Sequence, residues 1–193
     1  SAPGGGGGGA SRVESCLSAL RLLDLSFCDL EDDAAPSLAA ALANPNARAL
    51  AVLNLNGNDL SHLGMEVLGR DGLAWNSGLR KLDLSSNKLG DAGAIALTRS
   101  LARHPSLSDL KLDSCRLGLG AANALAGLIR LPNGPPIRRL SAASNHLGPD
   151  GFALLHAAVA AQSAQNAEAS ARSALEADKV GDMSPKEDAG PPN

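Results

Sequence analysis

The chain has 193 residues, 44% of them hydrophobic and only 2% aromatic, with a formal net charge of -3 and a pI near 5.8. This length suits a single domain that buries a core of its own. The nearly balanced charge gives no reason to expect nucleic-acid binding, and no apolar run reaches the roughly 18 residues of a membrane-spanning helix. We therefore expect neither nucleic acid nor a membrane among the partners.

The N-terminal residues divide into two short segments. Residues 1–11 contain the glycine run Gly4–Gly9 and are predicted to be a disordered, Gly-rich segment. Residues 12–19 are predicted to be either an N-terminal cap or the remnant of a preceding repeat. Their apolar residues share helical spacing with the start of the next segment: Val13, Cys16, Leu17 and Leu20. Neither segment has the charged and apolar regions of a secretory signal.

Residues 20–159 repeat one pattern five times, and successive copies begin 28 to 30 residues apart. Each copy has apolar residues, mostly leucines, at its positions 1, 4, 6 and 11. The copies begin at Leu20, Leu50, Leu79, Leu107 and Ile137. A fixed period of this kind predicts a solenoid, in which stacked repeats share one core.

Position 9 holds a cysteine or an asparagine in every copy: Cys28, Asn58, Asn87, Cys115 and Asn145. We predict a structural ladder, in which these side chains pair with backbone groups where the strand turns toward a helix. A ligand site is the less favoured interpretation. Three repeats separate the two cysteines, which places them roughly 14 Å apart at parallel-strand spacing, too far for a disulfide. We therefore expect free thiols.

A helix is predicted after each strand, because apolar residues then recur every four positions. Counted from position 11, a small residue follows after four places and a leucine after eight in every copy. An apolar residue follows after about twelve places in four copies: Leu42, Leu101, Ile129 and Val159. Ser61 and Asp91 are expected to be N-caps, and Pro149 is expected at the first helical position.

The second copy departs from the pattern because Gly69, Gly72 and Gly78 lie where its helix should continue. We predict that this helix ends early in an irregular loop that contains Trp75. In the interpretation that we favour, the indole fills the gap left by the short helix. The alternative is an exposed aromatic anchor for a partner.

After Val159 the repeat pattern stops. Residues 160–179 are rich in alanine and are predicted to be a C-terminal helical extension of the last repeat. Residues 180–193 contain several prolines, glycines and charged residues and are predicted to be a disordered tail.

The repeat length, the alternation of Asn and Cys, and segments such as Leu89-Gly-Asp-Ala-Gly-Ala-Ile-Ala-Leu97 resemble the ribonuclease-inhibitor-like leucine-rich repeat subfamily over residues 20–159. The resemblance implies an α/β solenoid, a horseshoe arc of about five strand-helix repeats with a parallel inner sheet and outer helices. It also implies protein binding. The subfamily includes inhibitors, the GTPase activator of Ran, the sensing arms of innate immune receptors, and components of cytoskeletal and ciliary assemblies.

Catalytic signatures are absent from the sequence. It has no phosphate-binding loop, no HExxH motif and no GxSxG elbow, and the glycine run lacks the flanking strand and helix of a dinucleotide site. The histidines fall at unrelated repeat positions: His62, His104, His146 and His156. We expect no enzymatic activity, no cofactor and no metal.

The outward-facing positions of the last three copies are rich in basic residues: Arg80, Lys81, Lys88, Lys111, Arg116, Arg138 and Arg139. With Trp75, they are the candidate partner-binding residues. One interpretation is a surface that attracts an acidic protein. The other, which the sequence favours, is ordinary surface charge partly paired with neighbouring aspartates. Because Phe27 is the only aromatic on this face, we expect modest affinity.

These features favour a non-catalytic protein-protein interaction module, a scaffold or structural subunit of a larger assembly with a cytoplasmic location. A cytoskeletal or ciliary assembly is suggested by family analogy alone. The alternatives are a small-GTPase regulator that resembles the Ran activator and the ligand-sensing portion of an innate immune receptor.

Overall fold

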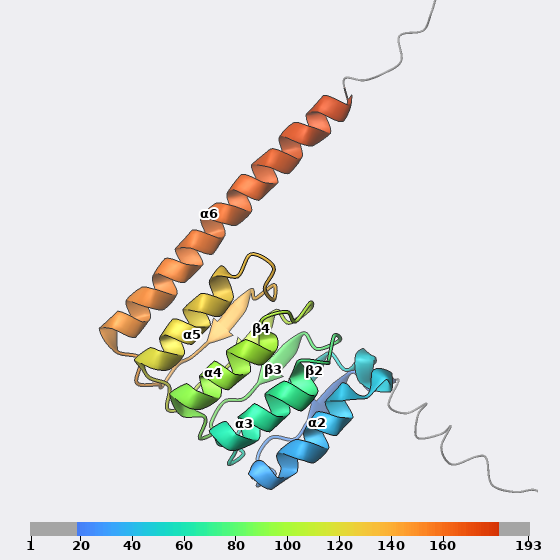
Figure 1. Cartoon of the computed structure of the whole chain (residues 1–193), viewed down its shortest axis with the longest axis vertical. Helices are drawn as coiled ribbons and strands as arrows, with labels where there is room; N and C mark the ends of the chain where they lie inside the picture. Colours follow the sequence, from blue (N-terminus) through green and yellow to red (C-terminus); the bar gives the residue numbers. More distant parts are fainter. Residues whose placement is uncertain (1–18, 182–193) are drawn as a thin grey trace, which may run out of the picture.

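The computed structural model describes residues 19–181, and within the last helix it describes side chains only as far as residue 167, residue 166 excepted. Nearly all of the N-terminal segments and of the C-terminal tail considered above therefore lie outside the described residues. The described chain alternates strands and helices from end to end (Figure 1).

Five strands of three residues each form one parallel sheet, in the order β1-β2-β3-β4-β5. Their bounds are β1 Leu22–Asp24, β2 Val52–Asn54, β3 Lys81–Asp83, β4 Asp109–Lys111 and β5 Arg139–Ser141. Each strand pairs with the next at the same repeat position, so that Leu53 lies between Leu23 and Leu82. Side chains at equal positions therefore stack in columns across the sheet.

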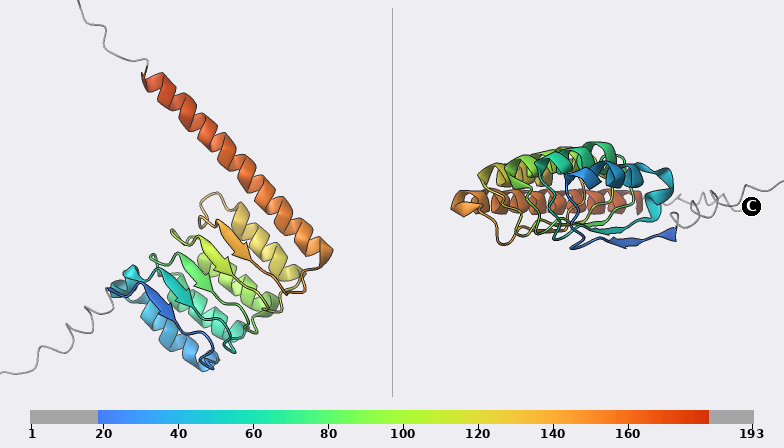
Figure 2. Two further views of the ribbon diagram at one scale, coloured as in Figure 1. Left: turned by 180° about the vertical axis from the view of Figure 1, so that it is seen from behind. Right: turned by 90° about the horizontal axis from the view of Figure 1, so that it is seen from below.

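Helices cover one face of the sheet and leave the other open (Figure 2). The α-helices are α2 Ala35–Ala43, α3 His62–Leu68, α4 Gly90–Leu101, α5 Leu119–Arg130 and α6 Gly148–Gly181. Shorter turns are η1 Asp32–Ala34, η2 Pro45–Ala49 and η3 Gly69–Leu73. This arrangement confirms the predicted α/β solenoid with a parallel inner sheet and outer helices.

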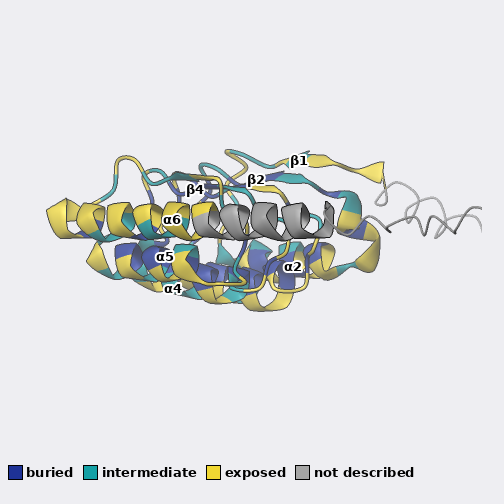
Figure 3. Ribbon diagram, turned by 90° about the horizontal axis from the view of Figure 1, so that it is seen from above, coloured by how far each residue is buried: buried dark blue, intermediate teal, exposed yellow. Residues whose placement is uncertain are grey.

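The core is a stack of leucine layers, one from each repeat. In the three central repeats the leucines at positions 4, 6 and 11 are fully buried: Leu53, Leu55, Leu60, Leu82, Leu84, Leu89, Leu110, Leu112 and Leu117. The corresponding Leu23, Leu25 and Leu30 of the first repeat are only partly buried. A repeat buries its leucines only between two neighbours (Figure 3), which is why the layers are mutually dependent.

The position 9 side chains join adjacent repeats through backbone hydrogen bonds. Asn58 accepts from the amides of Cys28 and Leu30 and donates to the carbonyls of Leu25 and Leu55, at 2.9 to 3.2 Å. Asn87 repeats this arrangement one layer on, accepting from Leu60. Each asparagine thus satisfies backbone groups of two successive turns.

The two cysteines of this column differ from each other. The Cys115 thiol is buried and donates to the carbonyl of Leu84 at 3.1 Å, and burial raises its pKa to about 11. Cys28, in the first repeat, is exposed because no earlier described repeat covers it. Both thiols are free.

A second set of buried polar side chains lies three residues before position 1, where the chain enters the strand. The side-chain oxygen of Asn76 accepts from the amides of Gly78 and Leu79. In the next repeat, Nδ1 of buried His104 accepts from the amide of Leu107 at 3.2 Å. This role of His104 was not predicted from the sequence, in which the histidines occupy unrelated repeat positions.

Of the three predictions made for helix N-termini, one is correct and two differ from the structure. Ser61 caps α3, since its hydroxyl accepts from the amide of Leu63. Asp91 was expected to cap its own helix but lies inside the first turn of α4, and its carboxylate accepts from the amides of Gly118 and Gly120 in the next repeat. Capping thus acts between repeats. Pro149 is the second residue of α6, one place later than predicted.

Asp32, in the first repeat, makes an equivalent contact with the second repeat. Its carboxylate accepts from the amide and the hydroxyl of Ser61 at 2.8 and 2.5 Å. Burial acts to raise the pKa of Asp32, but the hydrogen bonds from Ser61 outweigh burial, and the net shift is downward. The ionised carboxylate therefore links the first two repeats.

The second repeat is partly as predicted. Helix α3 ends early, at Leu68, but the chain continues as the π-helical turn η3 and not as an irregular loop. Gly72 makes this possible, since a Cβ there would lie 2.8 Å from Cα of Ala39 in α2. Trp75 does not fill the gap, because it is 74% exposed, whereas Leu73 is fully buried. The favoured interpretation of the indole is therefore wrong.

Helix α6 is 34 residues long and runs beyond the other helices through the alanine-rich residues 160–179 (Figure 1). Within the described part of the chain, no helix has the length and apolar character needed to cross a membrane. The solenoid thus ends in a long helix that packs on α5 along its first turns.

The amide ladder yields a stability prediction. Asn87→Ala should lower the free energy of unfolding by about 1 to 3 kcal/mol, because buried backbone groups of two repeats lose their partners. Asn123→Ala, which makes the same substitution at an exposed position of α5, should change it by less than about 0.5 kcal/mol. Urea unfolding followed by circular dichroism measures both. Equal midpoints for Asn87→Ala and the wild type would contradict the role of the ladder.

His104 predicts a dependence of stability on pH. Burial lowers the pKa of His104 below its ordinary value of 6.5, so the folded state binds a proton less readily than the unfolded chain. The contribution of neutral His104 to the free energy of unfolding should be fully present above about pH 6.5. It should decrease as the pH falls from there toward the pKa of His104 in the folded state. His104→Asn places the residue type of Asn76 at this position and should remove that part of the pH dependence. Urea titrations at several pH values compare the two proteins, and parallel curves would refute the assignment.

Candidate functional site: the trough on the open sheet face

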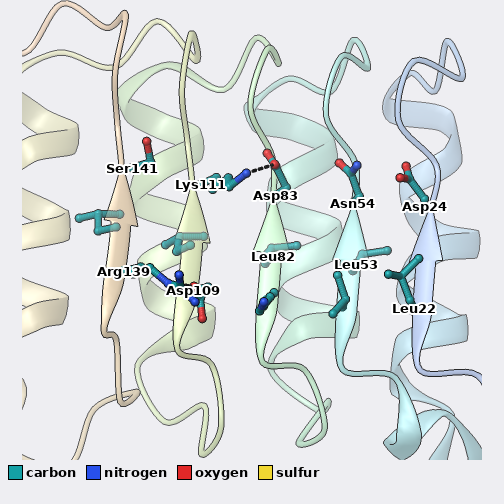
Figure 4. Close-up of a pocket in the computed structure, with 14 residues that line it drawn as sticks. Leu22, Asp24, Leu53, Asn54, Leu82, Asp83, Asp109, Lys111, Arg139 and Ser141 are labelled. Carbon is teal, nitrogen blue, oxygen red and sulfur yellow. Dashed lines mark hydrogen bonds and ion pairs between the residues drawn. The ribbon is translucent and has the colours of Figure 1, made fainter.

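The open face of the sheet carries a shallow trough that crosses all five strands (Figure 4). Its volume is about 640 Å³. One wall consists of the position 3 column: Leu22, Val52, Lys81, Asp109 and Arg139. The other wall consists of the position 5 column: Asp24, Asn54, Asp83, Lys111 and Ser141. The in-register parallel pairing produces these two straight walls.

The end of the trough at β1 and β2 is apolar on one wall. Leu22 is 57% exposed, and the neighbouring Val52 is half-buried. Phe27, at position 8 of the first repeat, is 71% exposed, and its ring lies over Gly57 of the second repeat. This end therefore offers exposed apolar side chains. Phe27 was expected on this face, whereas Leu22 and Val52 were not predicted, although two apolar residues at an outward-facing strand position were a readable signal.

The other end of the trough is charged, and its charges are paired between adjacent strands. Nζ of Lys111 lies 3.3 Å from the Asp83 carboxylate, and the Arg139 guanidinium contacts the Asp109 carboxylate. Outside the trough, Nζ of Lys88 lies 3.0 Å from Asp59. Three of the seven candidate basic residues thus contact aspartates of the preceding repeat.

The acidic residues on this face also accept hydrogen bonds from neighbouring hydroxyls. A hydrogen bond from Ser108 lowers the pKa of Asp109, and the contact with Arg139 acts in the same direction. Hydrogen bonds from the hydroxyl and amide of Ser26 lower the pKa of Asp24. A carboxyl with a lowered pKa stays ionised at neutral pH, so both groups suit charge recognition better than proton transfer.

The remaining four candidate basic residues lie in different places. Lys81 is exposed in the trough wall, whereas Arg80 and Arg138 precede their strands at position 2. Arg116 follows its strand in a turn, with φ of 59°. In the described part of the chain, none of the four lies within 4.0 Å of a carboxylate. The structure therefore brings only Lys81, Lys111 and Arg139 together in one site.

Trp75 lies apart from the trough, at the edge of the helical layer. It borders a separate cavity of about 370 Å³ together with Pro45, Arg48 and Asp71. The described residues contain no group of three or more side chains that could hold a metal ion. The trough is the site that is lined by side chains from all five strands.

Comparison with known proteins agrees with this architecture. The family model "Leucine Rich repeat" matches residues 18–39 and 76–97. The chain is 32% identical over 167 residues to human "NACHT, LRR and PYD domains-containing protein 12", covering 70% of this chain and 15% of that protein. It is 30% identical over 165 residues to pig ribonuclease inhibitor, covering 70% of this chain and 35% of the inhibitor. The chain thus spans only a minor part of these relatives.

A solved structure titled "Leiomodin-1 Actin-Binding Site 2 (ABS2)" superposes with a TM-score of 0.61 and 16% sequence identity, covering 84% of this chain and 94% of that one. At this identity the likeness concerns the fold. The family match, the relatives and the in-register strand-helix repeats agree, and this chain is a leucine-rich-repeat protein of the ribonuclease-inhibitor-like type.

Proposed function

We propose that this chain is a non-catalytic protein-binding subunit of a larger assembly, and that it binds a segment of its partner in the trough. Leucine-rich repeat domains are generally protein-interaction modules. The observation that carries the proposal is the trough itself, which is continuous across five strands and combines exposed apolar and charged side chains.

The dimensions of the trough suit a short extended segment. Four interstrand steps of about 4.8 Å give a length of roughly 19 Å, which about six extended residues would span. Such a segment would cross the strands at right angles and contact one pair of wall residues for each repeat.

The chemistry of the walls suggests the order of residues in the segment. Leu22 and Val52 would contact an apolar side chain at the β1 end, where burial favours binding. Lys81, which forms no ion pair with the described residues, would contact an acidic residue at the middle strand. Lys111 and Arg139 already contact aspartates, so they would add less attraction to an acidic partner.

The proposal extends to the type of assembly that contains this chain. A cytoskeletal assembly is in keeping with the similar fold of the actin-binding site 2 of leiomodin-1. A ciliary assembly rests on family analogy. A role in innate immune sensing has a specific observation in its favour, the similarity to the human NACHT, LRR and PYD protein. Regulation of a small GTPase, as by the Ran activator, remains the other alternative.

The test is quantitative capture of crosslinked partners by the full chain. The double variant Leu22→Asp, Lys81→Glu should reduce recovery of its specific partners at least tenfold, since it places charge at the apolar end and reverses charge at the middle strand. Arg99→Glu, which reverses an exposed charge on α4 outside the trough, is the matched control and should leave recovery unchanged.

Purified actin filaments and a small-GTPase turnover assay identify the class of partner. Sedimentation with actin that the double variant loses would support the cytoskeletal assembly, whereas accelerated GTP hydrolysis would replace the scaffold proposal with regulation. Equal recovery by the double variant and the wild type would refute the trough as the binding site.

A further inference from the structure

The four connections that lead from a helix to the next strand share one charge pattern. They comprise residues 44–51, 74–80, 102–108 and 131–138, and each contains a single arginine and no lysine, aspartate or glutamate. The arginines are Arg48, Arg80, Arg103 and Arg138. Because the strands are parallel, these connections all lie along one edge of the solenoid (Figure 2). We call this edge the arginine edge.

The opposite edge, where strands lead into helices, has the reverse charge. Its connections hold two basic residues, Lys88 and Arg116, and six acidic ones: Asp29, Glu31, Asp32, Asp33, Asp59 and Asp113. Acidic residues beside helix N-termini and basic residues beside helix C-termini complement the helix dipoles, which explains part of this separation. Arg80 and Arg138 lie next to strands, beyond the last turn of any helix, so the dipoles do not account for them.

The arginines of this edge have no acidic partner among the described residues. All four are exposed, and none lies within 4.0 Å of a described carboxylate. Lys88, Lys111 and Arg139, by contrast, each contact an aspartate of the preceding repeat. The guanidinium groups of the arginine edge are therefore available to an anion from outside the described chain.

Hydrogen bonds hold the connections against their neighbours. The side-chain amide of Asn76, in the second connection, donates to the carbonyl of Leu42 at the end of α2, at 3.1 Å. The hydroxyl of Ser106, in the third connection, donates to the carbonyl of Leu79 in the second, at 2.8 Å. The connections thus follow the spacing of the strands, and arginines at the same repeat position two strands apart are held about 10 Å from each other at the backbone.

Trp75 adds an apolar anchor point to the arginine edge. Its indole is 74% exposed and borders the cavity of about 370 Å³ that Pro45 and Arg48 also line. Asp71 is the acidic residue of this lining, and its carboxylate is paired with Arg70 at 2.8 Å. The volume is at the small end of ligand-binding cavities and suits one anchoring side chain. Tryptophan and arginine are also the residue types that most often dominate the binding energy of protein interfaces.

We propose that the arginine edge binds a short acidic segment of a partner protein, and that an apolar side chain of this segment enters the cavity beside Trp75. The planar guanidinium groups of Arg48 and Arg80 each pair with a carboxylate of the segment. A compact anion fits better than a nucleic acid or a membrane, because the chain has a net charge of -3 and attracts negative charge only locally. Nucleic-acid strands also stack on several aromatic side chains, whereas the four connections contain no phenylalanine or tyrosine and only one tryptophan.

This site goes beyond the trough and does not depend on it. Neither Trp75 nor any arginine of the arginine edge lines the trough. The two sites also have different readouts, since the test below follows the indole of Trp75. Failure of one proposal therefore leaves the other intact.

The fluorescence of Trp75 reports binding at the cavity directly, because the chain has no other tryptophan. The full chain is titrated with a short peptide that has a central leucine flanked on both sides by glutamates. The emission should move to shorter wavelengths as the indole loses contact with water. The same peptide with glutamine in place of every glutamate should bind roughly tenfold more weakly or worse, because it cannot form the charged pairs. An emission spectrum that stays unchanged up to about 1 mM glutamate peptide, or equal affinity for the two peptides, would overturn the proposal.

Charge reversal tests the assignment to this edge. The double variant Arg48→Glu, Arg80→Glu should raise the dissociation constant of the glutamate peptide roughly tenfold or more. Arg116→Glu, which reverses an exposed and unpaired charge of the opposite edge, is the matched control and should leave the constant unchanged. Circular dichroism verifies that both variants fold. Wild-type affinity in the double variant would refute the assignment. An emission shift at lower concentrations of oligothymidine or of phosphatidylserine vesicles would replace the acidic segment with a nucleic acid or a membrane.

Discussion

Every feature of this protein depends on the stacking of repeats that are individually too small to fold. A strand of three residues makes few backbone hydrogen bonds, and its leucines are buried only when a repeat lies on each side. The position 9 asparagines reinforce the stacking, since Asn58 and Asn87 each satisfy backbone groups of their own repeat and of the one before it. Burial of the leucines and hydrogen bonding by the asparagines therefore favour the same alignment of neighbouring strands.

That register also creates the trough. Because equal repeat positions pair across the sheet, the outward side chains form two straight walls. When the residue type changes from repeat to repeat, one end of a wall therefore differs chemically from the other. Leu22 and Arg139 are far apart in the sequence but occupy opposite ends of one wall. Ion pairs such as Lys111 with Asp83 then offset part of the positive charge at the basic end of the trough.

The same constraint explains the ends of the solenoid. The first and the last described repeats each have one side that no other described repeat covers. Polar side chains on that side suit contact with water, whereas apolar side chains favour contact with another surface. Leu23 and Leu25 at the first repeat are partly exposed members of the leucine layers. At the last described repeat, the places that a following helix buries in the first four repeats hold Phe152 and His156, and both side chains are exposed.

The sequence by itself determined the solenoid, the number of repeats, the leucine layers and the position 9 column, because each follows from a period that local residue types display directly. It did not reveal that Asp91 and Asp32 each bind the residue that begins the helix of the following repeat, because contacts across about 28 residues depend on how the repeats stack. It could not decide between burial and exposure of Trp75, since the π-helical turn and the close approach of Gly72 to Ala39 are tertiary features. The pairing of the basic residues was likewise decided only by the structure, because an ion pair requires a distance, and the sequence specifies only the charges.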